Sequence, residues 1–122
     1  MYQYLKKKHQ SFRHTFTGLR IAWQEEPNFR FQLVFGTLTI ILAFILHISE
    51  IEFLIVLSMV GLVLTAELFN TALEELCDKF QPTHDPHIAK IKDLAAAAVF
   101  VSALFAFIVG IIIFLPHVIV LL

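Results

Sequence analysis

FLIVLSMVGLVLTA, residues 53–66, continues without a break into ELFNTALEELCD, residues 67–78, and this junction decides the fold. The first half is apolar, and no proline or glycine separates it from the second half, so one helix is predicted to carry both. At about 100° per residue, the polar side chains of the second half share one helical face about 100° wide. They form a polar stripe of Glu67, Asn70, Thr71, Glu74 and Asp78. Acidic groups are unfavourable at membrane depth, so this stripe is predicted to be a functional site where water and lipid meet.

The whole chain has the composition of a membrane protein. Of its 122 residues 58% are hydrophobic, and 13 phenylalanines contribute to this share, while mean hydropathy is +0.79. We expect a single all-α membrane domain with a helix over about residues 5–26 and spans over about 29–48, 52–78 and 86–115. Three such spans bury little among themselves, so the polar stripe is expected to need partner helices from further copies of the chain.

Basic residues predict how the chain is oriented in the membrane. They cluster up to the start of the first span and between the apolar stretches of the second and third spans. Because basic residues are retained on the cytoplasmic side, the N-terminus and the second loop are predicted to be cytoplasmic. The net charge of -1 gives no indication of nucleic-acid binding. The nine basic residues are Lys6, Lys7, Lys8, Arg13, Arg20, Arg30, Lys79, Lys90 and Lys92.

The N-terminal segment is predicted to form an amphipathic helix. Its apolar residues Phe12, Phe16, Leu19 and Trp23 project within about 60° of one another, with basic residues to one side. This pattern favours a helix that lies in the cytoplasmic interface, with Trp23 at the depth of the lipid headgroups. Packing against the spanning helices is the alternative interpretation.

Prolines mark the predicted helix boundaries. Pro27 follows Glu26, so Glu26 is predicted to lie at a bend close to the start of the first span. Pro82 is predicted to end the second spanning helix. Asp85 and Pro86 have the pattern of an N-cap followed by a proline at the first helical position, so the third spanning helix is expected to begin there.

Depth divides the polar stripe into two parts. Counted along the apolar run, Glu67 is predicted about two turns inside the hydrocarbon, whereas Glu74 and Asp78 lie near or beyond its boundary. Desolvation in general increases the proton affinity of a carboxylate, which suits a base acting on a hydroxyl group. Carboxylates near water, together with Glu26 at its bend, are the oxygen ligands that Mg²⁺ prefers. For each single acid, helix packing or solvation is the alternative interpretation.

Several motifs resemble those of the small prokaryotic membrane kinases, the diacylglycerol kinases and undecaprenol kinases. The most specific is AELFNTALE at residues 66–74, followed by Asp78 and, downstream, by Lys92-Asp93. The resemblance covers nearly the whole chain, because it extends upstream through Gly18-Leu19-Arg20, Trp23, Glu26 and Phe29-Arg30.

This resemblance implies a homotrimer of three-span subunits in the bacterial cytoplasmic membrane. Its active sites would lie between subunits and use ATP and Mg²⁺ to phosphorylate a lipid hydroxyl group. Glu67 resembles the family's general base, and Glu26 and Glu74 resemble the carboxylates that hold the metal. The positions that match residues around the nucleotide are Glu26, Asn70, Glu74, Asp78, Lys92 and Asp93.

The resemblance also indicates the lipid. Positions near the substrate are matched by Arg20, Trp23, Arg30 and Glu67. EEPNFR at residues 25–30 and VGIIIFLP at residues 109–116 resemble the branch that favours undecaprenol, and diacylglycerol is the alternative. Lys7, His14 and Asp85 depart from the family pattern, which leaves the contacts to adenine open.

Two other classes of protein fit the sequence less well. An ion-conducting oligomer needs polar groups along the full membrane depth, whereas residues 53–64 contain only Ser58. A non-catalytic assembly subunit would need neither the acidic residues of the stripe nor the charged pair Lys92-Asp93 that follows in the next helix. A lipid kinase is therefore the function that we predict.

Overall fold

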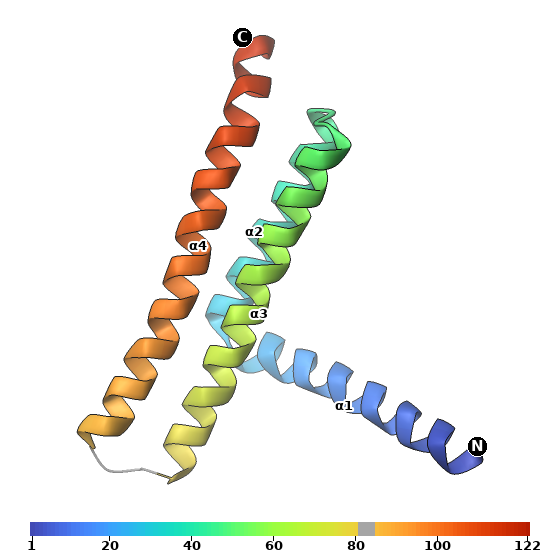
Figure 1. Cartoon of the computed structure of the whole chain (residues 1–122), viewed down its shortest axis with the longest axis vertical. Helices are drawn as coiled ribbons and strands as arrows, with labels where there is room; N and C mark the ends of the chain where they lie inside the picture. Colours follow the sequence, from blue (N-terminus) through green and yellow to red (C-terminus); the bar gives the residue numbers. More distant parts are fainter. Residues whose placement is uncertain (81–84) are drawn as a thin grey trace.

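The computed structural model describes residues 1–80 and 85–122, and every regular element in these ranges is an α-helix. Three of the helices are long and apolar enough to cross a membrane, which confirms the predicted all-helical fold with three helices able to span. The helices are α1 (Tyr2–Glu25), α2 (Pro27–Ile45), α3 (Glu50–Phe80) and α4 (Pro86–Leu121) (Figure 1).

Helix α3 is central to the arrangement. It packs against both α2 and α4, while α1 contacts α2 and points away from the other three helices (Figure 1). Most large apolar side chains of the spanning helices are exposed, for example Phe35 and Phe105. In a membrane protein such surfaces face lipid or another subunit. The exposed apolar surfaces are compatible with contacts between subunits, and the homotrimer stays a prediction.

The predicted bend between α1 and α2 is present at Glu26. Its backbone is extended, with φ -111° and ψ 100°, and Pro27 occupies the first turn of α2. The Arg30 guanidinium donates hydrogen bonds from Nη1 to the carbonyl oxygens of Trp23 and Gln24, at 2.9 and 3.1 Å. Because the last carbonyl groups of a helix lack partners within it, Arg30 satisfies the end of α1 and holds the bend.

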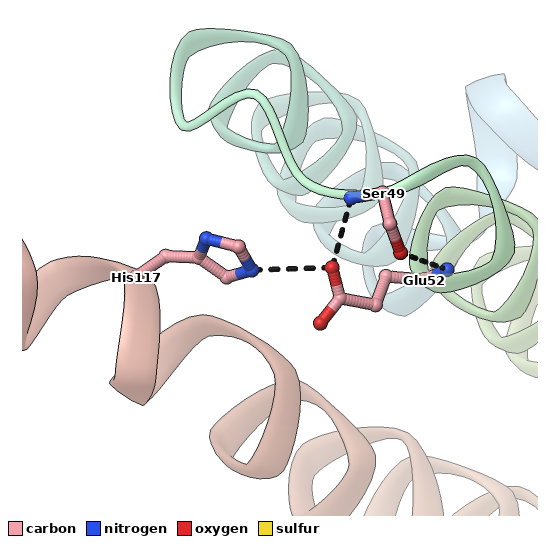
Figure 2. Close-up of polar contacts among 3 residues, drawn as sticks. All are labelled: Ser49, Glu52 and His117. Atoms are coloured by element: carbon pink, nitrogen blue, oxygen red, sulfur yellow. Dashed lines mark hydrogen bonds and ion pairs between the residues drawn. The ribbon is translucent and has the colours of Figure 1, made fainter.

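The turn between α2 and α3 is closed by a capping box. The Ser49 hydroxyl accepts a hydrogen bond from the Glu52 backbone N–H at 3.2 Å, and the Glu52 carboxylate accepts one from the Ser49 N–H at 2.8 Å. Figure 2 shows the same carboxylate beside the His117 ring of α4, with 3.1 Å between Oε2 and Nε2. The start of α3 is thereby tied to the last turns of α4, far along α3 from the polar stripe.

The start of α4 agrees with the sequence pattern. The Asp85 carboxylate accepts hydrogen bonds from the backbone N–H groups of His87 and Ile88, at 2.8 and 3.3 Å. Pro86 occupies the first turn, where its missing N–H has no intrahelical partner to lose. The predicted N-cap is confirmed.

The C-terminal ends of α4 and α3 bear on the predicted helix boundaries. Helix α4 continues to Leu121, beyond the predicted end near residue 115. Pro116 lies inside the helix and does not end it. A proline removes one backbone hydrogen bond, and spanning helices tolerate this loss. The predicted break at Pro82 lies outside the described residues, and α3 is helical up to Phe80.

Close packing of α2 on α3 depends on Gly36. A Cβ atom at this position would lie 2.7 Å from Cγ1 of Val60, whose side chain is stiff in a helix. We expect Gly36→Ala to lower the free energy of unfolding by about 1–3 kcal/mol, measured by unfolding in detergent micelles. Gly18→Ala is the control, since nothing lies within 4 Å of its added Cβ and alanine favours helix. An unchanged midpoint for Gly36→Ala would contradict this account.

Candidate functional site

Glu67, the first residue of the polar stripe of α3, faces α2. Glu67 is 2% exposed, and its Oε2 accepts a hydrogen bond from Gln32 Nε2 of α2 at 3.1 Å. Further along α3, Asn70 is 9% exposed, and its Nδ2 donates to Glu74 Oε1 at 3.4 Å. The predicted base is therefore buried and held by a side chain from a different helix.

Three buried polar atoms around Glu67 have no hydrogen-bond partner within residues 1–80 and 85–122. They are Gln32 Oε1, Asn70 Oδ1 and Thr71 Oγ1. Buried polar atoms of folded proteins are nearly always paired, so these atoms are available to a ligand, water or another subunit. The stripe thus has hydrogen-bonding capacity that packing within the described residues of one chain does not use.

Glu26 approaches the stripe from the bend between α1 and α2. Burial, followed by the negative charges of Glu74 and Glu67, raises the pKa of the Glu26 carboxyl group above its usual value. Coulomb interactions weaken with distance, so Glu26 lies within electrostatic range of the acidic residues of α3. Its role as a metal ligand together with Glu74 stays a prediction.

The carboxylates of Glu26 and Glu74 are the type of ligand that suits a magnesium ion that also carries phosphates. In the part of the chain that the structure describes, no three His, Cys, Asp or Glu side chains are grouped so as to hold a metal ion. Mg²⁺ is often bound through only one or two carboxylates, with water and substrate phosphates as the remaining ligands. Glu26 and Glu74 supply two carboxylates, and a cation would relieve the repulsion between them.

Charged residues beyond the buried part of the stripe connect α3 with α4. Lys92 Nζ lies 2.8 Å from Asp78 Oδ1, and the two side chains are 38% and 65% exposed. Both groups are therefore accessible to a solute, and an exposed ion pair of this kind adds little stability. Asp93 follows on α4 and is exposed.

The residues predicted to lie near the lipid gather around the bend. Arg20 and Trp23 are exposed in the last turns of α1. Arg30 holds the end of α1 through its hydrogen bonds to the Trp23 and Gln24 carbonyl oxygens, a contact that the sequence did not predict. Their contacts with a lipid stay predictions.

An apolar groove of about 630 Å³ lies between α2, α3 and α4. Gln32 and Thr39 are the polar side chains in its lining, and Val63 lines it one helical turn before Glu67. The groove therefore approaches Glu67. Gln32 both lines the groove and donates a hydrogen bond to Glu67. Sequence reasoning did not single out Gln32, although a polar side chain inside an apolar span was an available signal.

Residues 13–114 match the family model described as prokaryotic diacylglycerol kinase. The chain belongs to the prokaryotic diacylglycerol kinase family. The matched range contains all the site residues named above, from Arg20 to Asp93. The predicted family is confirmed.

Curated relatives in this family are similar over most of the chain. Undecaprenol kinase of Bacillus subtilis is 35% identical over 112 residues, which cover 92% of this chain and 91% of the relative. Diacylglycerol kinase of Synechocystis sp. is 37% identical over 107 residues, 87% of this chain and 61% of the relative. Diacylglycerol kinase of Escherichia coli K12 is 30% identical over 104 residues, 85% of each.

Membership of this family agrees with the helices of the structure. The family consists of prokaryotic lipid kinases, and three helices able to cross a membrane fit a bacterial membrane protein. The chain is therefore an enzyme of the lipid phosphotransferase class. The roles of Glu67, Glu26 and Glu74 stay predictions.

Proposed function

We propose that the chain is an ATP-dependent kinase that transfers the γ-phosphate directly to the hydroxyl group of a membrane lipid. One observation carries this proposal: the buried carboxylate of Glu67 is held by Gln32 beside an apolar groove, in a member of a lipid kinase family. A carboxylate in such a place is suited to take the proton of a lipid hydroxyl group.

Glu67 is the general base of the proposed reaction. Its carboxylate accepts the hydroxyl proton, and the lipid oxygen attacks the γ-phosphorus in line with the leaving group. A P–O bond to the lipid forms while the bond from the γ-phosphorus to the bridging oxygen breaks. The products are a lipid phosphate, ADP and a proton. Catalysis of this kind depends mainly on positioning and on stabilising charge.

The remaining polar residues surround the nucleotide in this proposal. Glu26 and Glu74 would hold Mg²⁺, which supplies charge neutralisation for the phosphates when it is bound. Asn70 orients Glu74 through their hydrogen bond of 3.4 Å. Lys92 binds the nucleotide phosphates from the aqueous side through its positive charge, Asp78 holds the Lys92 ammonium at 2.8 Å, and Asp93 lies next to Lys92 beside the nucleotide.

Undecaprenol is the lipid that we propose first, and diacylglycerol is the alternative. The relative with 92% coverage of this chain is named undecaprenol kinase, and two others are named diacylglycerol kinase. The apolar lining of the groove is suited to a hydrocarbon chain of either lipid. Arg20, Trp23 and Arg30 would lie at headgroup depth.

We also propose how the enzyme sits in the membrane. The N-terminus and the polar stripe face the cytoplasm, as the basic residues predict. Helix α1 lies in the interface, a position supported by the exposed apolar side chains of Phe12 and Phe16. Three copies assemble, so that part of the exposed apolar surface of the spanning helices is buried.

Transfer of label from ATP tests the proposed function. The purified protein in detergent micelles is incubated with [γ-³²P]ATP, Mg²⁺ and undecaprenol, diacylglycerol or, as a control, a lipid without a free hydroxyl group. We expect label in a lipid phosphate and none in the control. Label in neither hydroxyl lipid would contradict the proposal, and the ratio of kcat/KM values decides the preferred lipid.

An ion-conducting oligomer gains no support from the structure. Ser58 is the polar residue within residues 53–64, and its hydroxyl donates to the Leu54 carbonyl oxygen of the same helix at 2.7 Å. This part of α3 therefore offers no continuous polar path for an ion.

Lys92→Gln tests the proposed phosphate contact. We expect kcat to fall by about 100-fold, because a positive charge that stabilises the transferred phosphate is lost. The unfolding midpoint should change little, since the Lys92–Asp78 pair is exposed. Lys90→Gln, at an exposed lysine of the same helix, is the control for both measurements. Unchanged kcat in Lys92→Gln would remove Lys92 from the site.

A further inference from the structure

We propose that Gln32 is a positioning residue, which orients the Glu67 carboxylate for proton transfer; this inference rests on the proposed kinase function. Gln32 Nε2 donates to Glu67 Oε2 at 3.1 Å, from α2 to α3. Gln32 is the one hydrogen-bond donor to this carboxylate within the described ranges. The bond leaves the other oxygen, Oε1, to accept the proton of a substrate hydroxyl group.

Burial makes such an orienting contact necessary. Glu67 is 2% exposed, so little water is available to solvate and align its carboxylate. A glutamate side chain has several rotatable bonds, and a misplacement of about 1 Å at a reacting group can reduce a rate about 100-fold. A donor fixed on the neighbouring helix removes this freedom before the substrate binds.

The amide of Gln32 also has a feature that simple helix packing does not explain. Its Oε1 is buried and has no partner in the described part of the chain. Gln32 lines the apolar groove as well as touching Glu67. A glutamine selected only to join two helices would leave this oxygen unpaired at an energetic cost. At the point where the groove approaches the base, the oxygen is able to accept a hydrogen bond from an incoming headgroup.

Two substitutions at position 32 separate positioning from packing. Gln32→Met keeps a similar length and removes the donor, whereas Gln32→His retains a ring N–H donor. We expect Gln32→Met to lower kcat by about 10- to 100-fold while the KM for ATP stays unchanged. Gln32→His should recover most of the lost kcat, because a donor to Glu67 is restored.

Thr37→Val is the matched control. Thr37 is an exposed polar residue of α2 outside the groove lining, and its hydroxyl donates to the Leu33 carbonyl oxygen at 2.7 Å. Its removal should leave kcat unchanged. The substitution Gln32→Met should also have no further effect on kcat in a Glu67→Gln background, because Gln32 acts on the chemical step through Glu67.

The outcomes distinguish this inference from the proposed function. Wild-type protein that labels neither undecaprenol nor diacylglycerol would overturn the kinase function itself. If the wild type is active, a normal kcat in Gln32→Met overturns the positioning role and leaves the kinase function intact. Equal losses in Gln32→Met and Gln32→His would also overturn it, because the donor would then be irrelevant. Loss in Gln32→Met with recovery in Gln32→His supports it.

Discussion

Glu67→Gln is expected to reduce lipid phosphorylation by about 100- to 10,000-fold, the range that a general base contributes. Glutamine has nearly the same shape as glutamate, and its amide oxygen is able to accept the Gln32 hydrogen bond that Glu67 Oε2 accepts at 3.1 Å. It cannot take a proton from the lipid hydroxyl group at neutral pH. The variant should therefore fold and bind ATP while the chemical step fails.

Initial rates of label transfer at saturating ATP and lipid measure this effect, and nucleotide binding is measured separately. Glu75→Gln is the matched control, because Glu75 is an exposed acid on the same helix. It should retain wild-type activity. Wild-type turnover in Glu67→Gln would remove Glu67 from the role of base, whatever the result for the control.

Glu26→Gln and Glu74→Gln are each expected to raise the Mg²⁺ concentration for half-maximal activity by at least about 10-fold. A neutral amide is a much weaker ligand for a hard cation than a carboxylate, and even residues outside the coordination sphere change metal affinity by this amount. The measurement is a Mg²⁺ titration of activity at constant ATP. Glu50→Gln, at the opposite end of α3, is the control. If either variant keeps the wild-type Mg²⁺ dependence, the residue that it replaces is not a metal ligand.

The same Glu26→Gln substitution should stabilise the metal-free protein. Burial and the charges of Glu74 and Glu67 raise the pKa of Glu26, so the folded chain binds a proton there more tightly than the unfolded chain. Stability therefore falls as the pH rises from the ordinary to the raised pKa, and ionised Glu26 opposes folding at neutral pH. Glutamine removes this opposition. A lower Tm for Glu26→Gln in Mg²⁺-free buffer would contradict the prediction.

Opposite effects on stability and activity would identify Glu26 as a residue retained for function. Natural proteins carry unfavourable local features mainly at functional sites. Gly36→Ala provides the contrast, since its effect arises from a 2.7 Å approach to Val60 in the packing of α2 on α3. There a loss of stability is expected without a change in Mg²⁺ dependence.

Much of this site could be predicted because helical geometry is local. The spacing of Glu67, Asn70 and Glu74 places them on one face of any helix, whatever surrounds it. Pro27 predicted the bend at Glu26, and Asp85 predicted the start of α4, because both act on neighbouring backbone groups.

Contacts between helices could not be predicted in the same way. Gln32 and Glu67 are 35 positions apart, and nothing in either segment specifies the other as a partner. The hydrogen bonds of Arg30 to the end of α1 were not predicted either, and its expected place beside the lipid stays a prediction. The tie between Glu52 and His117 spans 65 positions and was also not foreseen.

The sequence by itself therefore determined the three spans and the acidic face of the second, because hydropathy and helical periodicity depend on residues close together in the chain. Tertiary structure decided that Glu67 of this face meets α2, that Gln32 holds Glu67 at 3.1 Å, and that Glu26 lies within electrostatic range of the acids of α3. Hydrogen bonds and charge interactions depend on distances through space, and only the packing of the helices sets those distances.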